Sequence, residues 1–209
     1  MRVKAVTVGM LGTNCWITAD EETGAAMIFD PADNAPRIFE IIQKNDFKPE
    51  MIALTHCHFD HFLAAKELKE LCGGIPVIIP AKDKILAENP TYNLSSGMGG
   101  NPCTLEFDKT VDSGDILTCG YLKAKVIFTP GHTPGGVCYY FENEHVLIAG
   151  DTLFFMSVGR SDFPLSDGYT LNESIKEKLF TLPDDTQVFT GHGNPTSIGF
   201  EKMNNMYVY

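Results

Sequence analysis

Residues 51–61 read MIALTHCHFDH, an apolar run that changes without a break into imidazole and carboxylate side chains. The apolar part, MIALT, is typical of a buried strand. His56 and His58 are two residues apart, so their side chains point the same way in an extended backbone. Asp60 and His61 are adjacent at the expected start of the next helix and project in other directions. The segment therefore suits two neighbouring metal sites better than one.

Three later apolar runs also end in a metal-competent side chain, each time directly after a glycine. The runs KVIFTP, HVLIA and QVFT lead into Gly131-His132, Gly150-Asp151 and Gly191-His192. Glycine permits positive φ and close backbone approach, so the chain can turn sharply there. Strand ends at a sheet edge are where α/β proteins place ligand sites. We therefore expect the four segments to converge on one site.

Each of these residues also has a simpler interpretation when it is taken alone. Asp60 suits a helix cap, His132 and His192 suit turn or core histidines, and Asp151 suits a turn. The combination favours a metal site, because only His145 of the six histidines falls outside the pattern. It lies in the polar turn FENEH, where we expect it at the surface.

The ligand types narrow the choice of metal. Imidazole together with carboxylate suits Zn, Fe or Mn. The six cysteines form no C-x-x-C pair, which argues against a structural zinc site of the cysteine type. In a chain of this size we expect free, mostly buried thiols. Cys57, inside the histidine segment, is expected to be a buried bystander rather than a ligand.

Composition limits the class of protein. The 209 residues are 44% apolar and 21% charged, which suits one folded domain over residues 1–209. The net charge of −11 repels phosphate backbones and anionic lipids, so we expect a small-molecule substrate and neither nucleic acid nor membrane as partner. No apolar run approaches a membrane span, and glycines interrupt the N-terminal MRVKAVTVGMLGTNCWI, so a cytoplasmic location is expected.

Strand patterns lead in both halves of the chain, with helices between them. This order favours layered α/β architecture over a helical bundle. A long loop rich in Gly, Asn, Ser and Pro is expected at 89–103, and another at 155–168. Strands are expected at 3–8, 15–18, 25–30, 51–56, 76–80, 115–119, 122–128, 136–141, 145–150 and 187–191, and helices at 36–45, 60–74, 81–88 and 171–180.

Taken together, the motifs resemble those of the metallo-β-lactamase superfamily, and most strongly its glyoxalase II-like branch. The resemblance spans residues 56–193 in the family order, and Asp30 fits it as well. It implies an α/β fold, a four-layer αββα sandwich with the metal site at one edge between the two sheets. The motifs that carry it are His56-x-His58-x-Asp60-His61, TPGHTPGG around His132, GDTLF around Asp151 and GHG around His192.

The resemblance also implies a role for each ligand. The first of two divalent ions would be held by His56, His58 and His132, the second by Asp60, His61 and His192, and Asp151 would bridge them. Zinc is the expected metal, with iron or manganese open. The implied activity is hydrolysis of a thioester of the S-lactoylglutathione kind by a bridging hydroxide, which Asp60 would orient. Such a thiolate can leave without a proton donor.

Two further features bear on the substrate. The segment GRSDFP, residues 159–164, resembles a stretch shared by small glyoxalase II-like proteins and persulfide dioxygenases. Arg160 is expected to pair with Asp162 beside the site, and substrate contact by Arg160 is a weaker expectation. The chain continues for only 17 residues after His192, so the sequence has no room for the helical extension with which full-length glyoxalase II enzymes contact glutathione.

Other functions remain open at this level. A persulfide dioxygenase with a single iron, a lactonase-type hydrolase and a non-catalytic metal-binding protein would all suit this fold. A β-lactamase is less expected, because GRSDFP and GDTLF resemble the glyoxalase-like branch. The physiological substrate, the metal and the oligomeric state are left open by the sequence.

Overall fold

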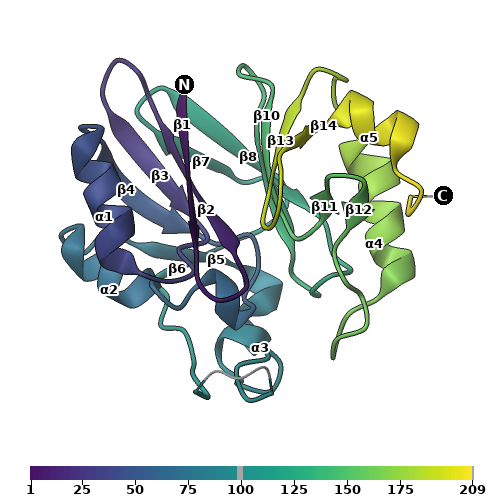
Figure 1. Ribbon diagram of the computed structural model, residues 1–209, viewed down its shortest axis with the longest axis horizontal. Helices are drawn as coiled ribbons and strands as arrows, with labels where there is room; N and C mark the ends of the chain where they lie inside the picture. The colour runs from purple at the N-terminus through teal and green to yellow at the C-terminus, as the bar shows by residue number, and fades with distance from the viewer. Residues whose placement is uncertain (98–100, 209) are drawn as a thin grey trace.

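A computed structural model of the protein describes residues 1–97 and 101–208. Two six-stranded mixed β-sheets face each other, and helices cover the outer face of each sheet (Figure 1). The expected four-layer αββα sandwich is confirmed. No helix in the described part of the chain is long and apolar enough to cross a membrane.

The first sheet comes from the N-terminal half of the chain. Its strands lie side by side in sequence order, antiparallel from β1 to β3 and parallel from β3 to β6. They are β1 (Arg2–Val8), β2 (Thr13–Ala19), β3 (Ala25–Phe29), β4 (Lys48–Ala53), β5 (Val77–Pro80) and β6 (Lys109–Val111). The helices of this half are α1 (Ala35–Lys44), α2 (Ala65–Leu71) and α3 (Lys84–Ala87), with short 3-10 turns η1 (Phe59–His61) and η2 (Ala81–Asp83).

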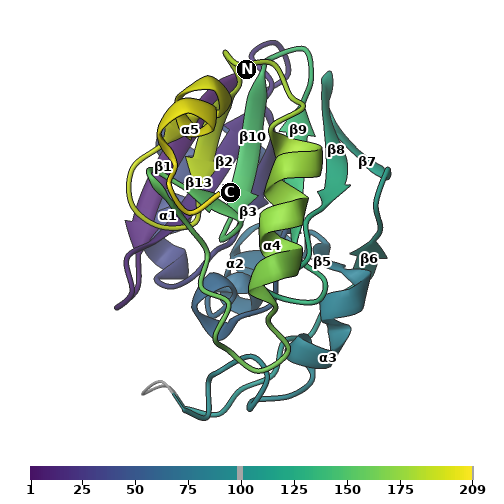
Figure 2. The same cartoon turned by 90° about the vertical axis from the view of Figure 1, so that its right-hand side faces the viewer.

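The second sheet has the strand order β14-β13-β10-β9-β8-β7. Helices α4 and α5 cover its outer face, as Figure 2 shows. The strands are β7 (Ile116–Cys119), β8 (Leu122–Phe128), β9 (Val137–Phe141), β10 (Val146–Gly150), β13 (Gln187–Thr190) and β14 (Thr196–Ser197). The remaining elements are the hairpin β11 (Leu153–Phe154) and β12 (Ser157–Val158), then α4 (Gly168–Ser174), the π-turn η3 (Ile175–Leu179) and α5 (Ile198–Asn204).

Apolar side chains of the two sheets meet in a shared core. Phe29 on β3 packs against Tyr139 and Phe141 on β9, with ring centroids 5.0 and 6.2 Å apart. Further apolar clusters lie under α1 and α2 on one side and under α4 on the other. Burial on both faces explains why β2, β3 and β9 are buried at every position.

Helix α1 forms where the apolar spacing predicts it. Ile38 and Ile42 are buried against the sheet, and the Asn34 side chain caps the helix by accepting a hydrogen bond from the backbone N–H of Arg37. The expected helix at 60–74 was wrong in its start. Asp60 and His61 lie in η1, and α2 begins only at Ala65.

The C-terminal tail also differs from the expectation. It contains β14 and α5, which begins where the Ser197 hydroxyl accepts a hydrogen bond from the N–H of Phe200. Strands β6, β11 and β12 were missed, since each has only two or three residues and such runs carry no periodicity.

The expected loop at 89–103 begins as a series of turns. Its two ends are joined where the Asn93 amide donates to the carbonyl of Cys103, 2.8 Å away. Residues 98–100 of this segment lie outside the described part of the chain. All six cysteines are free, as expected.

Candidate metal centre

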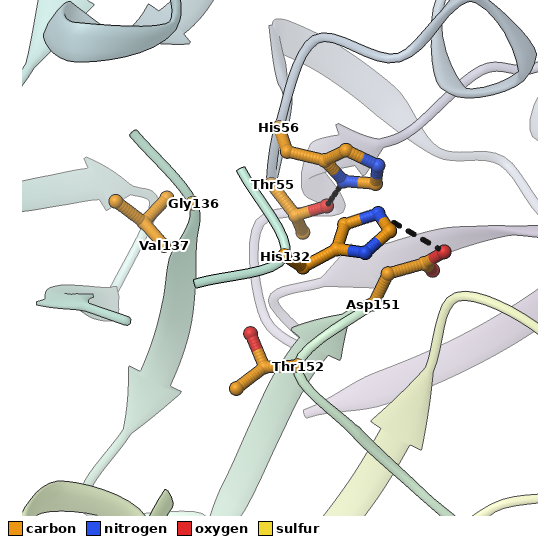
Figure 3. A pocket seen from close by; sticks show the side chains of 7 residues that line it. All are labelled: Thr55, His56, His132, Gly136, Val137, Asp151 and Thr152. Carbon is orange, nitrogen blue, oxygen red and sulfur yellow. Dashed lines mark hydrogen bonds and ion pairs between the residues drawn. The ribbon is translucent and has the colours of Figure 1, made fainter. Parts of the chain in front are cut away.

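The loops that follow β4, β8, β10 and β13 converge between the two sheets. Figure 3 shows His56, His132 and Asp151 facing one another at this point. All seven side chains that the sequence singled out as ligands take part in three overlapping groups, within each of which the ligand atoms lie within 4.8 Å of one another. The groups are His56, His58 and His132; His56, His61 and Asp151; and Asp60, His61 and His192.

In the first group, hydrogen bonds fix which ring nitrogens are free. His132 donates from Nδ1 to the carbonyl of Arg160 at 2.7 Å, which leaves Nε2 as an acceptor. The Nδ1 of His56 lies 3.1 Å from the Thr55 hydroxyl, which leaves its Nε2 free. Nε2 of His132 lies 3.0 Å from Nδ1 of His58. Two ligands of one tetrahedral zinc ion would lie about 3.3 Å apart, so this spacing suits a shared cation.

Asp60, His61 and His192, called the second group from here on, lie on the other side of the site. Nε2 of His192 is 3.3 Å from Oδ2 of Asp60, and Nε2 of His61 is 3.7 Å from the same oxygen. The Nδ1 of His192 donates to the carbonyl of Leu11 at 3.2 Å. This bond turns Nε2 of His192 toward the carboxylate.

Asp151 lies between the two groups. Its Oδ1 is 3.4 Å from Nε2 of His61, while its Oδ2 is 3.6 Å from Nε2 of His132. Oδ2 is also 3.5 Å from Nε2 of His192. One carboxylate therefore faces nitrogens of both groups, which is the position a bridging ligand needs.

The titration of the histidines differs between the two groups. Burial lowers the pKa of His56 well below its usual value and that of His58 to about 3, and neighbouring histidines add to the effect. Burial also acts to lower the pKa of His61, but the carboxylates of Asp151 and Asp60 outweigh it and raise the pKa well above the usual value. His56 and His58 of the first group are therefore neutral at pH 7. In the second group, the carboxylates around His61 stabilise a positive charge.

Several buried atoms of the site have no hydrogen-bond partner among the described residues. They include Nε2 of His56, Nε2 of His61 and Oδ1 of Asp151. A buried polar atom without a partner costs about 1–3 kcal/mol, so three at one point need an explanation. Divalent cations would satisfy all of them, and the set of neutral imidazoles and carboxylates is the donor set such ions prefer. The residues present therefore fit a metal centre.

Two glycines allow the ligands to approach so closely. Gly150 has φ +50°, and a Cβ there would overlap the side chain of Thr55. A Cβ on Gly191 would overlap the carboxylate of Asp151. The expectation that glycines before the ligands aim them into a common space holds at both positions.

A pocket of about 320 Å³ lies above the ligands. Five of the ligand residues line it, and its walls are Leu11, Leu94, Phe154, Phe163 and Arg160. The Arg160 guanidinium binds both carboxylate oxygens of Asp162, at 2.9 and 2.8 Å, and lies over the Phe163 ring. The expected ion pair is confirmed, and the positive charge of Arg160 at the pocket is already partnered.

Two other side chains behave as the sequence suggested. His145 is exposed and pairs with Asp185 at 2.8 Å, away from the site. The thiol of Cys57 is buried, and burial raises its pKa well above the usual value. Cys57 belongs to none of the ligand groups found among the described residues.

Supporting residues of the site were largely missed. Asp30 is buried and accepts hydrogen bonds from the N–H and the hydroxyl of Thr55, and its Oδ2 lies 3.1 Å from Nδ1 of His61. Asp30 was expected at the site only as part of a resemblance. Leu11 belongs to no motif, and Phe154 was quoted only as the last residue of GDTLF, so neither was expected as a pocket wall.

The chain belongs to the metallo-beta-lactamase superfamily, whose family model matches residues 8–192. Members of this superfamily use divalent metals, and the His/Asp groups described above are of that kind.

Individual relatives are similar over almost the whole chain. A hydroxyacylglutathione hydrolase, GloC of Haemophilus influenzae, is 34% identical over 209 residues, which is 100% of this chain and 98% of that protein. The solved structure of the BLEG-1 B3 metallo-beta-lactamase has a TM-score of 0.94 and 35% identity, covering 99% of both chains.

Two more solved structures are similar over most of their length. TTHA1623 in a di-iron-bound form has a TM-score of 0.85 and 32% identity, covering 98% of this chain and 99% of that one. ETHE1 from Myxococcus xanthus has a TM-score of 0.80 and 28% identity, covering 100% of this chain and 84% of that one.

Proposed function

We propose that this protein is a dinuclear metal-dependent hydrolase of the glyoxalase II-like branch, acting on a thioester of a small 2-hydroxy acid. The proposal rests on one observation, the seven ligand-type side chains that converge beneath a largely apolar pocket. In this proposal His56, His58 and His132 hold one ion and Asp60, His61 and His192 hold the other. Asp151 faces both groups and would bridge the two ions.

Bound divalent ions would supply hydroxide at neutral pH and polarise the acyl carbonyl. The protein's own side chains would orient the attacking water and enclose the acyl group. Asp60 lines the pocket and lies within 3.3 Å of Nε2 of His192, so its carboxylate can accept a hydrogen bond from an attacking water and orient it. Leu11 and Phe154 would cover the acyl group and exclude bulk water.

The leaving group follows from what the pocket lacks. Apart from the proposed metal ligands, Arg160 is the one polar side chain among the described residues that line it, and a guanidinium does not release a proton at neutral pH. A thiolate, with a pKa near 8.5, leaves without such help, whereas an amide nitrogen needs a proton. The lining therefore supports a thioester over an amide as the substrate.

The similarity to GloC supports the same choice, since that protein is named a hydroxyacylglutathione hydrolase. We propose zinc as the metal of this chain. The di-iron form of TTHA1623 makes iron the first competitor. We propose Arg160 as a substrate contact only at the rim, because Asp162 already occupies its guanidinium.

The test combines metal analysis with turnover. Purified protein is analysed for metals and assayed with S-lactoylglutathione, both in air and without oxygen. The proposal expects two ions per chain and thioester cleavage at the same rate in both atmospheres. Two bound ions without cleavage of any thioester in a panel of acyl thioesters would overturn it.

The second candidate is a persulfide dioxygenase-like oxidoreductase with a single iron. The segment GRSDFP, which resembles a stretch of persulfide dioxygenases, favours it, and the similarity to ETHE1 leaves it open. The same experiment separates the two candidates, since one iron per chain and oxygen consumption with a persulfide would select the oxidoreductase. The similarity to BLEG-1 adds a β-lactam to the panel, alongside a lactone.

A further inference from the structure

A buried carboxylate, that of Asp83, contacts the two loops that carry the first group of histidines. Asp83 ends η2, has no exposed surface, and is neither one of the seven proposed ligands nor part of the pocket lining. A carboxylate is costly to bury unless its oxygens accept hydrogen bonds. The donors that bind its two oxygens therefore show which parts of the chain Asp83 connects.

Three donors from two separate loops meet on this carboxylate. Oδ2 accepts from the backbone N–H of Cys57 at 3.0 Å and from the hydroxyl of Thr133 at 2.8 Å. Oδ1 accepts from the backbone N–H of Gly135 at 2.7 Å. The loop of Cys57 and the loop of Thr133 and Gly135 are thus tied together by one side chain.

These two loops carry the three histidines of the first group. Cys57 stands between His56 and His58, and Thr133 directly follows His132. The distance between the first two histidines and the third therefore depends on how the loops are joined. In the structure Nδ1 of His58 and Nε2 of His132 lie 3.0 Å apart, close enough to share one ion.

The packing at Gly135 shows how close the contact with Asp83 is. A Cβ on Gly135 would overlap the backbone nitrogen of Asp83 and lie 2.5 Å from its Oδ1. The backbone of Gly135, in the loop after His132, therefore packs directly against Asp83 with no side chain between them. Burial acts to raise the pKa of Asp83 to about 6, against the opposing effect of its three hydrogen bonds.

We infer that Asp83 is a positioning residue, which sets the spacing of His56 and His58 against His132 so that the three-histidine site is formed before metal arrives. This inference rests on the proposed assignment of these histidines to one ion. It predicts a selective effect, in which loss of the carboxylate lowers the affinity for one ion and leaves the affinity for the other unchanged. Residues that orient metal ligands are typically worth 10–100-fold in metal affinity.

The test is a cobalt(II) titration of metal-free Asp83→Asn protein, followed by absorption spectroscopy and competition with a chelator. Asparagine keeps the shape but presents an NH₂ group to one of two N–H donors, so at least one bond is lost. We expect about 10–100-fold weaker binding of one cobalt ion, with the other unchanged. We also expect kcat to recover at high metal concentration, which a general loss of structure would not allow.

Asp20→Asn is the matched control. Asp20 is also a buried carboxylate that accepts from two loops, from the N–H of Thr23 at 2.7 Å and from the N–H of Tyr121 at 3.2 Å. It follows β2, at the end of the strand opposite Thr13, which forms a bridge with His192. Asp20→Asn should therefore leave the affinities of both cobalt ions unchanged.

A second variant keeps the inference testable if Asp83→Asn does not fold. Thr133→Val removes only the hydroxyl donor and should lower the affinity for the same ion by a smaller factor. Folded Asp83→Asn protein that binds both ions as wild type does would overturn the inference, and so would unchanged binding by Thr133→Val in the absence of a folded Asp83 variant. Wild-type protein that binds a single ion would instead refute the dinuclear assignment, and unchanged affinity of folded Asp83→Asn protein for that ion would then overturn this inference.

Discussion

Gly159 has no space for a side chain. A Cβ at this position would overlap the carbonyl oxygen of Asp151 and lie 3.2 Å from Nδ1 of His132. The residue thus sits against two of the proposed ligands at once. Its neighbour Arg160 provides the carbonyl that orients the His132 ring.

Gly159→Ala should therefore disturb the site through the backbone. We expect a loss of about 1–3 kcal/mol in the free energy of unfolding, together with weaker metal binding, because the carbonyl of Asp151 must move. Urea denaturation and metal titration measure the two effects. Gly97→Ala is the control, since a Cβ there meets no atom of the described residues within 4 Å. Equal behaviour of the two variants would contradict the close packing described for Gly159.

His61 is the histidine that contacts the most carboxylates. Its ring nitrogens lie within 3.7 Å of oxygens of Asp30, Asp60 and Asp151. His61→Ala should reduce the metal content from two ions to one and lower kcat/KM about 100-fold or more. The exposed His145 serves as the control, and His145→Ala should keep both ions. A His61→Ala protein with two ions and full turnover would refute the dinuclear assignment.

The hairpin of β11 and β12 is held by a buried glutamate on α5. Glu201 accepts hydrogen bonds from the N–H of Met156, from the hydroxyl of Thr196 and from the amide of Asn205. Phe154 on β11 is a wall of the pocket. The C-terminal helix thus supports one side of the proposed substrate site.

Glu201→Gln should weaken this support. Glutamine keeps one acceptor oxygen, so one donor loses its partner, and we expect a loss of about 1–3 kcal/mol in stability. The KM should rise more than kcat falls, since the hairpin shapes the pocket and carries none of the seven proposed ligands. Lys202→Met removes an exposed ion pair with Asp184 and an exposed hydrogen bond to the carbonyl of Leu182, and should cost at most about 1 kcal/mol. A Glu201→Gln protein as stable as Lys202→Met would show that the glutamate does not hold the hairpin.

Element by element, the sequence predicted long periodic segments well and short ones poorly. Helix α1 and strands β8 and β10 follow from their apolar spacing. The first turn after His58 was expected to be α-helical, but it closes with 3-10 bonds, and residues 62–64 intervene before α2. Local spacing does not distinguish the two turns, because the placement of Asp60 and His61 is set by contacts with distant loops.

The seven side chains that converge at the site could be identified from the sequence, because each follows an apolar strand and three follow a glycine. Their supports could not. Asp83 lies 27 residues after His56, in the segment AKDK, which matches no motif. Only the fold brings its carboxylate into contact with Thr133. Arg160 was noticed for its side chain, whereas its carbonyl is what contacts His132.

At the scale of the whole molecule, the buried histidines set how stability depends on pH. In metal-free protein, burial is the main cause that lowers the pKa values of His56, His58 and His132. Below pH 6.5 these histidines therefore bind protons in the unfolded chain but stay neutral in the folded protein. Stability from these groups is present above pH 6.5 and is lost as the pH falls toward 3, by about 1.4 kcal/mol per pH unit for each histidine.

Carboxylates raise the pKa values of His61 and His192 against the effect of burial, so these two act in the opposite sense. Their contribution is present below pH 6.5 and is lost as the pH rises through their folded pKa values. Asp83, with a pKa of about 6, also stabilises the fold at low pH, but it is one group against three histidines. Metal-free protein should therefore be most stable near neutral pH.

Urea midpoints of the metal-free protein between pH 4 and 9 would measure this profile. We expect a maximum near pH 6.5, with a fall on both sides. Metal-loaded protein should lose the fall on the alkaline side, since bound ions displace the protons of His61 and His192. A stability that rises steadily from pH 7 to 9 without metal would contradict the assignment of charge in the second group.

The most direct test of the central claim is anomalous X-ray diffraction from crystals of the metal-loaded protein, recorded at the absorption edge of the bound metal. The account predicts two anomalous peaks per chain, roughly 3.5–4 Å apart, with the side chain of Asp151 between them. One peak next to His56, His58 and His132 alone, or none among the seven side chains, would contradict it.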